Sequence, residues 1–152
     1  MKLIFYLSLM FALTGCAKIN VYEKDVHIPV QAWYYNFKPS FSFTISDTSA
    51  VYSVYIVLRH TDAYKYNNLW LSLGSQAPGD SMHFQNINLL LANDQKGWEG
   101  SGMDDIYELR KNITPGPVPF KRPGNYIFAI AQIMRENPLL HIMDVGIRVE
   151  KE

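Results

Sequence analysis

Strict alternation of hydrophobic and polar residues is the clearest pattern in the chain, and it recurs in three separate segments. In the first, Phe41, Phe43 and Ile45 alternate with Ser42 and Thr44. The other two segments carry their hydrophobic residues at Leu69, Leu71, Leu73, Val145, Ile147 and Val149. A period of two puts alternate side chains on opposite faces of an extended chain, so each segment is predicted to be a β-strand with one buried face.

Two further segments, residues 52–58 and 126–131, are hydrophobic on both faces, which predicts central strands covered on both sides. Turns rich in Pro, Gly, Asn and Asp separate the segments, and no stretch after the N-terminal run shows the spacing of an amphipathic helix. This pattern predicts one all-β domain over residues 37–152. Its expected architecture is an antiparallel β-sandwich, jelly-roll-like or immunoglobulin-like.

Three stretches of this domain are less regular. Residues 82–91 are predicted to be extended, with a bulge near Gln85 and Asn86 because the hydrophobic phase changes there. Residues 98–112 are predicted to be irregular at first and then extended. Residues 114–119 contain three prolines, which exclude them from a central strand because proline lacks the amide hydrogen of a ladder.

The N-terminus has the layout of a secretory signal peptide. Lys2 precedes a mostly apolar run from Leu3 to Leu13, which is shorter than the roughly 20 residues that a bilayer-spanning helix needs. Leu13-Thr14-Gly15-Cys16 follows and resembles a bacterial lipobox, the signal for cleavage before the Cys and lipid attachment to its sulfur. We therefore expect residues 1–15 to be removed and Cys16, the only cysteine, to carry the lipid.

Residues 16–36 are expected to hold the lipidated Cys and a tether, in which the alternation of Val26, Ile28 and Val30 can form a short edge strand. A lipid on Cys16 would anchor the domain to a membrane without inserting it. Ala17 stands where an Asp would be unfavourable for transfer to the outer membrane, so the expected location is the periplasmic face of the outer membrane.

Charge and motif content argue against several functions. Lys and Arg total 14, Asp and Glu total 14, and the balance lacks the basic excess that nucleic-acid binding needs. The four histidines have no metal-ligand spacing, and no cofactor motif is present, so neither metal nor cofactor is expected. Asp104 and Asp105 are adjacent, which would place them on opposite faces of a strand; turn carboxylates are a better interpretation than a catalytic pair. A non-enzyme is therefore expected.

Aromatic residues offer a different kind of site. Trp33-Tyr34-Tyr35, Trp70 and Trp98 lie beside strand breaks or on nominally polar strand faces. Exposed rings of this kind can stack on sugars or anchor a partner protein. For Trp70 and Trp98, packing in the core is the slightly favoured interpretation.

Three stretches together resemble the GldH family of gliding-motility lipoproteins. They are LRHTDAYKYNNL at 58–69, GWEGSGMDDIY at 97–107 and GNYIFAIAQIMR at 124–135, which continues to residue 147. The resemblance departs from the family pattern at Lys65 and Asn67. It implies a non-enzymatic outer-membrane lipoprotein required for gliding, in a system tied to surface-adhesin movement and type IX secretion, with other motility or secretion lipoproteins as partners.

The three stretches share polar and aromatic residues at predicted strand ends. Because loops at one end of a sandwich converge, they suggest a single interaction patch. Its members would be Arg59, Tyr64, Asn68, Trp98, Asp104 and Arg135. The competing interpretation is structural ion pairing, Arg59 with Asp104 or Arg135 with Asp144. A carbohydrate- or peptidoglycan-binding module is the alternative function, and a hydrolase with two paired carboxylates comes third.

Overall fold

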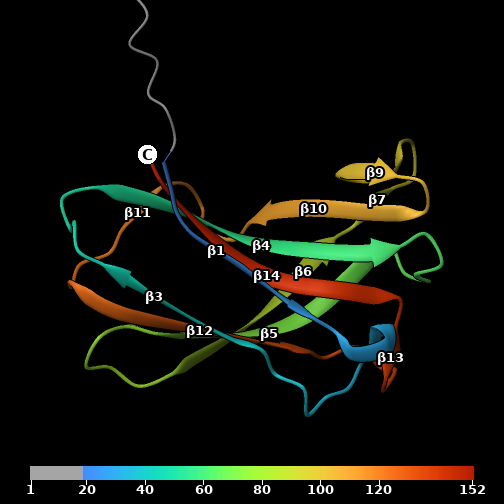
Figure 1. Cartoon of the computed structure of the whole chain (residues 1–152), viewed down its shortest axis with the longest axis horizontal. Helices are drawn as coiled ribbons and strands as arrows, with labels where there is room; N and C mark the ends of the chain where they lie inside the picture. The colour runs from blue at the N-terminus through green and yellow to red at the C-terminus, as the bar shows by residue number, and fades with distance from the viewer. Residues whose placement is uncertain (1–18) are drawn as a thin grey trace, which may run out of the picture.

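The computed structural model describes residues 19–152, which form two antiparallel β-sheets packed face to face (Figure 1). The larger sheet has six strands, in the order β1-β14-β4-β10-β9, with β11 paired to β4 beside them. These strands are β1 (Ile19–His27), β14 (Ile142–Lys151), β4 (Val51–Thr61), β10 (Ile106–Asn112), β9 (Ser101–Met103) and β11 (Val118–Pro119).

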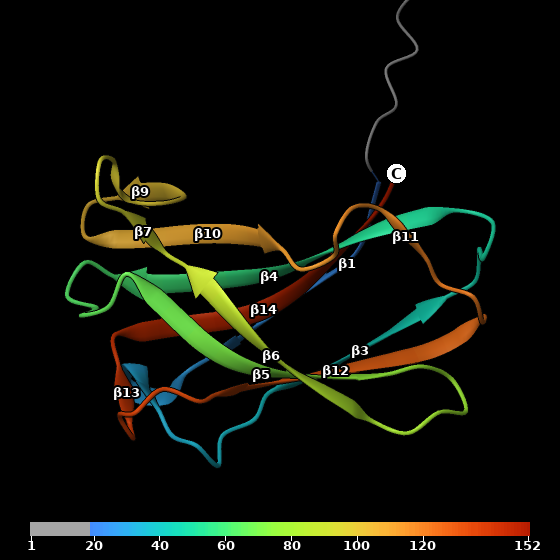
Figure 2. The same cartoon turned by 180° about the vertical axis from the view of Figure 1, so that it is seen from behind.

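The smaller sheet has four strands in the order β3-β12-β5-β6, and Figure 2 brings β5 and β6 to the front. They are β3 (Ser40–Ile45), β12 (Gly124–Gln132), β5 (Asn68–Gln76) and β6 (His83–Leu90). Two short ladders and a 3-10 turn complete the fold: β2 (Ala32–Trp33) with β13 (Leu139–Leu140), β7 (Ala92–Asn93) with β8 (Gly97–Trp98), and η2 (Pro29–Gln31). The predicted all-β, antiparallel sandwich is confirmed. Between residues 19 and 152, no helix has the length and apolarity to cross a bilayer.

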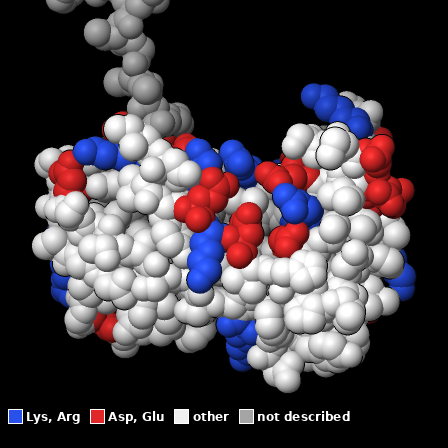
Figure 3. All heavy atoms as spheres, in the orientation of Figure 1, with Lys and Arg blue, Asp and Glu red and all other residues white. Residues whose placement is uncertain are grey.

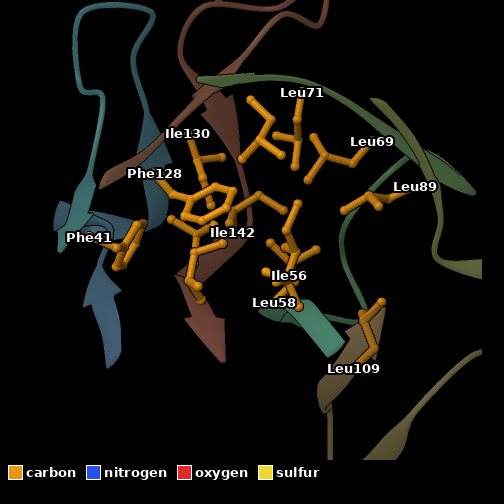
Figure 4. Packing of buried hydrophobic residues seen from close by; sticks show 14 of the residues in the cluster. Phe41, Ile56, Leu58, Leu69, Leu71, Leu89, Leu109, Phe128, Ile130 and Ile142 are labelled. Atoms are coloured by element: carbon orange, nitrogen blue, oxygen red, sulfur yellow. The ribbon is translucent and has the colours of Figure 1, made fainter. Parts of the chain in front are cut away.

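The core lies between the two sheets and consists of the residues that alternation places on one face of each strand (Figure 4). Leu69, Leu71 and Leu73 of β5 are at most 1% exposed, and Ile56 and Leu58 of β4 approach from the opposite sheet. β4 lies between β14 and β10, and β12 lies between β3 and β5. Both segments predicted to be central strands therefore are central.

β1 is an edge strand of the larger sheet, and it occupies part of the stretch that the sequence assigns to the tether. It pairs with β14 from Ile19, opposite Lys151, to His27, opposite Asp144. The edge strand thus lies earlier than the alternation of residues 26–30 indicates, and Val30 instead lies in the turn η2, 88% exposed. Cys16 and the predicted signal peptide lie outside the described residues.

The bulge predicted near Gln85 and Asn86 is wrong. β6 pairs with β5 in unbroken register, from His83 opposite Ser75 to Leu90 opposite Asn68. The hydrophobic phase changes for another reason: Phe84 is 70% exposed and lies on the outer face of the sheet, over Gly74. A hydrophobic residue on the solvent side mimics the phase shift of a bulge.

Residues 98–112 form the short strands β8 and β9 and then the regular strand β10, as predicted. Asp104 and Asp105 make the turn between β9 and β10, and Asp104 has a φ of 56°, a left-handed conformation that Asp tolerates better than most residues. The proline-rich stretch contributes only β11, which pairs with the first two residues of β4.

Candidate docking groove

The outer face of the four-stranded sheet has a floor of small side chains between large ones. Alternate residues of β5 and β12 point outward, and at the centre of the sheet these are Ser72, Gly74, Ala129 and Ala131. Gly74 pairs with Phe84 of β6, and a Cβ at Gly74 would come within 2.9 Å of the Phe84 ring. Glycine at this position therefore lets the Phe84 ring lie against the sheet.

Two hollows follow this face and share Ile133 and Met134, so we treat them as one groove, the outer groove. The first hollow, of about 470 Å³, has Ser72, Ala129 and Ala131 in its lining, together with the larger side chains of Tyr35, Phe84 and Met134. The second, of about 370 Å³, is lined by Tyr66, Asn68, Trp70, Ile133, Met134 and Arg135. Trp70 is 42% exposed, so packing in the core is not its role.

A buried glutamine holds the loop that lines both hollows. Gln132, the last residue of β12, is 1% exposed and accepts a hydrogen bond at Oε1 from Met134 N at 2.8 Å. Its Nε2 donates to Trp33 O at 3.1 Å and to Glu136 O at 3.0 Å. Both polar atoms of the side chain are thus used: two bonds hold residues 133–136, and the third joins Gln132 to β2.

The same loop is tied to the aromatic side chains of the groove. The Tyr35 hydroxyl donates to Met134 O at 2.7 Å, and Tyr35 N donates to Asn137 Oδ1 at 2.9 Å. Ile133 N donates to Trp70 O at 3.0 Å, which extends the β5–β12 ladder by one residue. The rings of Tyr35 and Trp70 are therefore positioned by backbone bonds as well as by packing.

The outer groove carries positively charged side chains and no negatively charged ones. No Asp or Glu lines either hollow, and the two cationic residues in the lining are Lys38 and Arg135. Within residues 19–152 neither of them forms an ion pair. The nearest carboxylate of the loop, Glu136, contacts Lys65 at 3.4 Å. The groove therefore presents apolar surface, amide and hydroxyl groups, and uncompensated positive charge.

The structure places the six residues of the predicted patch in three locations. Asn68 and Arg135 line the second hollow of the outer groove. Arg59 and Asp104 line a third hollow, which has a volume of about 410 Å³ and lies beside the β9–β10 hairpin. The two remaining residues lie in a buried aromatic cluster and are described below. Neither predicted ion pair forms: Arg59 contacts Glu108 at 2.8 Å and Asp144 at 3.3 Å instead.

The aromatic cluster surrounds His60, which is fully buried at the end of β4. Tyr64 is 3% exposed, and its ring and that of Trp98 lie 5.7 Å and 4.6 Å from the His60 ring. Tyr107 stacks on the imidazole at 5.7 Å. Tyr64 is therefore part of the interior and not available as a docking surface, whereas Trp98 is partly buried and packs against the core.

His60 is held as a neutral side chain. Its Nδ1 lies 2.8 Å from Thr61 O, and because a carbonyl only accepts, Nδ1 carries the proton. Its Nε2 has no hydrogen-bond partner in the described part of the chain. Burial lowers the pKa of His60, since protonation would place a charge among aromatic rings.

The outer face of the six-stranded sheet has the opposite character, because acidic and basic side chains intermingle across it (Figure 3). Arg148 pairs with Glu23 and Glu150, and Arg110 contacts Glu23 at 3.3 Å and Glu108 at 3.7 Å. Burial raises the pKa of Asp25 in this network, and the neighbouring carboxylates add to the rise. This face is a ladder of cross-strand ion pairs that join β1, β14, β4 and β10.

Sequence reasoning found part of the groove and missed part. Tyr35 and Trp70 were candidates as aromatic platforms, and Asn68 and Arg135 as members of the patch. Phe84 and Met134 were missed. The phase change at Phe84 was the available signal, since it marks a large hydrophobic residue on the solvent side of β6.

Comparison with known proteins covers nearly the whole chain. The family model of the GldH lipoprotein matches residues 20–149. A gliding motility lipoprotein GldH homolog of Christiangramia forsetii is 28% identical over 145 residues, which are 91% of this chain and 88% of the relative. The gliding motility lipoprotein GldH of Flavobacterium johnsoniae is 28% identical over 147 residues, 92% of this chain and 90% of the relative.

Among solved structures, the infectious bursal disease virus VP2 subviral particle matches 89% of this chain and 32% of its own, at 13% identity and a TM-score of 0.37. The family assignment rests on the sequence match, which includes every strand that builds the outer groove. The chain belongs to the GldH lipoprotein family.

Proposed function

We propose that this protein is a non-catalytic interaction module of the gliding-motility machinery, anchored through a lipid on Cys16 to the periplasmic face of the outer membrane. Its partners would be other motility or secretion lipoproteins. The names of two relatives, each matched over about nine tenths of this chain, support the link to motility. The observation that carries the docking role is the outer groove, where Trp70 and Phe84 are exposed beside a floor of small residues.

The covalent geometry near the anchor supports a close association with the membrane. Three residue steps separate Cys16 from Ile19, the first residue of β1. A chain spans at most about 3.6 Å per residue, so a lipid on Cys16 would hold the start of β1 within about 11 Å of the membrane surface. The domain would therefore stand directly on the membrane surface, and its partners would be proteins of the same envelope layer.

The arrangement of the titratable groups supports a role without catalysis. Asp104 and Glu108 are the carboxylates that line the third hollow, and Glu108 is engaged by Arg59, which also contacts Asp144. His60 is enclosed by Tyr64, Trp98 and Tyr107, with its Nδ1 committed to a backbone carbonyl. A general acid or base must reach the proton that it moves, and Glu108 and His60 are turned toward other protein groups.

The test is site-specific photo-crosslinking in intact cells. A photoreactive residue replaces Trp70 in the outer groove, and a matched variant carries it at Met103, which is 79% exposed and lines the third hollow. We expect a discrete adduct with another envelope lipoprotein from position 70 and none from position 103. An adduct from position 103 alone would contradict docking at the outer groove and would indicate that the partner binds at the β9–β10 hairpin.

Function is tested by the same pair of positions. In a gliding strain whose own GldH is replaced by this chain, Trp70→Ala is expected to impair colony spreading, whereas Met103→Ala is not. The protein level of each variant is measured in the membrane fraction, because loss of the protein would also stop spreading. Normal spreading of Trp70→Ala at a normal protein level would contradict the docking role of the groove.

A glycan-binding role is the second candidate, and the composition of the outer groove favours it. Trp70 and Phe84 offer ring faces to sugars; Ser72 lies between them, and Asn68 lies beyond Trp70, each with hydrogen-bonding groups. Affinity electrophoresis in gels that contain soluble peptidoglycan fragments tests this role. Retardation that Trp70→Ala abolishes would support it, and unretarded migration of the wild type in every gel would exclude it.

A further inference from the structure

β6 is an edge strand that lacks the features by which proteins protect an exposed edge. Its eight residues, His83–Leu90, contain no Asp, Glu, Lys, Arg or Pro, and its register with β5 has no bulge. Charged residues, prolines, bulges and short length are the usual protections against pairing with another strand. A long, regular and uncharged edge is therefore a surface that favours pairing.

The other edges of the two sheets are protected. β1 has a register shift between Asn20 and Tyr22 and carries Glu23, Lys24 and Asp25. β9 has three residues, and the free part of β10 carries Arg110 and Lys111. Tyr22 lies against β3, with its ring 5.3 Å from that of Phe43 and its hydroxyl in contact with the Ser42 backbone. Among the edges of the described residues, β6 is the longest that has neither a charge nor a proline nor a bulge.

The hydrogen-bond pattern shows which backbone groups of β6 face outward. Leu91 N donates to Asn67 O at 2.8 Å, and these residues continue the β5–β6 register. Bonded pairs recur at every second residue of an antiparallel ladder, so the odd-numbered residues of β6 bond to β5. The N–H and C=O groups of Phe84, Asn86, Asn88 and Leu90 therefore point away from the sheet.

The side chains of β6 are complementary to a second copy of the same strand. If two β6 strands pair antiparallel about a two-fold axis at Ile87, Phe84 meets Leu90 of the other copy, and Asn86 meets Asn88. Phe84 is 70% and Leu90 is 55% exposed in the single chain, so both would lose exposed apolar surface. The paired segment ends at Leu90, before β7 begins at Ala92.

We infer that two copies of this protein associate through antiparallel pairing of β6 with β6, which joins two four-stranded sheets into one continuous eight-stranded sheet. In this register the outward-facing residues form four hydrogen-bonded pairs with two bonds each. Ile87 and Leu90 line neither hollow of the outer groove, whereas Phe84 lines the first hollow and would also face Leu90 of the other copy, so the two surfaces share Phe84.

The register gives a specific crosslinking test in the full-length, membrane-anchored protein. Ile87 faces itself across the two-fold axis in a non-hydrogen-bonded pair, where Cα atoms lie about 4.5 Å apart and a disulfide can form. Ile87→Cys is therefore expected to give a dimer on non-reducing gels after mild oxidation of cells. The matched control is Ser42→Cys on the edge strand β3, and the wild type reports any crosslink through Cys16.

Each outcome decides the inference. A dimer from Ile87→Cys, absent from Ser42→Cys and the wild type, supports it. A stronger dimer from Asn86→Cys than from Ile87→Cys overturns the register, because position 86 would then lie on the axis. An adduct of Ile87→Cys with a different protein shows that another chain occupies the edge, and no adduct at either position shows that the edge is unpaired; both results overturn the inference.

Two further variants, each combined with Ile87→Cys, separate loss of pairing from loss of folding. The amide hydrogen of Asn86 faces away from β5, so Asn86→Pro should preserve the β5 ladder but block the partner strand. It should lower the yield of the disulfide-linked dimer about tenfold, while Asn86→Ala does not. Leu90→Lys puts a charge opposite Phe84 of the other copy and should also lower the yield. Unchanged yields in both variants, with thermal unfolding like that of the wild type, would contradict pairing through this edge.

Discussion

The loop that lines the outer groove depends on one buried side chain, Gln132. Replacement by Met keeps the length and volume of the side chain but removes both polar atoms. Three hydrogen bonds are lost, and Trp33 O, Glu136 O and Met134 N are left without this partner. At about 1 kcal/mol for each bond, the free energy of unfolding should fall by about 3 kcal/mol, because Gln132 is 1% exposed and water has little access to replace the bonds.

Urea unfolding of Gln132→Met measures this loss, and Gln76→Met is the matched control. Gln76 makes a single side-chain bond, to Asp80 O at 2.8 Å, near the surface, so its loss should be about 1 kcal/mol or less. Hydrogen exchange adds a local measurement: the Met134 amide should exchange faster in Gln132→Met because its acceptor is gone. A loss in Gln132→Met no larger than in the control, with Met134 exchange unchanged, would refute the role of Gln132 in holding the loop.

Two other predictions concern the larger sheet. Burial lowers the pKa of His60 in the folded protein below its usual 6.5. As the pH falls, the unfolded chain therefore binds the proton at a higher pH than the folded protein does. The free energy of unfolding should decrease below about pH 6.5, by up to about 1.4 kcal/mol per pH unit. Urea unfolding at several pH values should show a shallower acid slope for His60→Leu than for the wild type or the exposed-site variant His83→Gln; equal slopes would contradict a neutral, buried His60. Gly146→Ala should lower the free energy of unfolding by about 2 kcal/mol, because its Cβ would lie 1.9 Å from Asp25 Oδ1 and 2.6 Å from Lys24 O. An unchanged thermal midpoint would show that β1 can move aside without cost.

The strands were predictable where one face of the strand is buried and the other is polar. Phe41, Phe43 and Ile45, and likewise the leucines of β5, alternate because the core lies on one side only. β4 and β12 were recognisable as central because neighbours on both sides favour hydrophobic residues on both faces. In these segments local pattern and global fold agree, so the sequence alone is sufficient.

The bounds of β1 were not predictable from alternation, because its polar residues are paired across strands. Glu23 contacts Arg148 and Arg110, which are distant in sequence, so in the sequence it resembles a residue of a solvated tether. Tyr64 was placed on the surface, and Trp98 was left between surface and core, for a related reason. Both lie in irregular stretches beside predicted strand ends, and burial there depends on how the chain folds back over His60, which no periodicity reports.

The two outer faces of the sandwich differ in the desolvation free energy that a partner would have to overcome to bind them. On the six-stranded sheet, Arg59, Arg110 and Arg148 are already paired with carboxylates, and a partner would have to desolvate those pairs without replacing them. On the four-stranded sheet, the outer groove and the β6 edge present apolar side chains, amides and unpaired backbone groups, which gain contacts when covered. The docking and self-association that we propose therefore both use the four-stranded sheet, while the ion-pair ladder holds the edge strand β1 against β14.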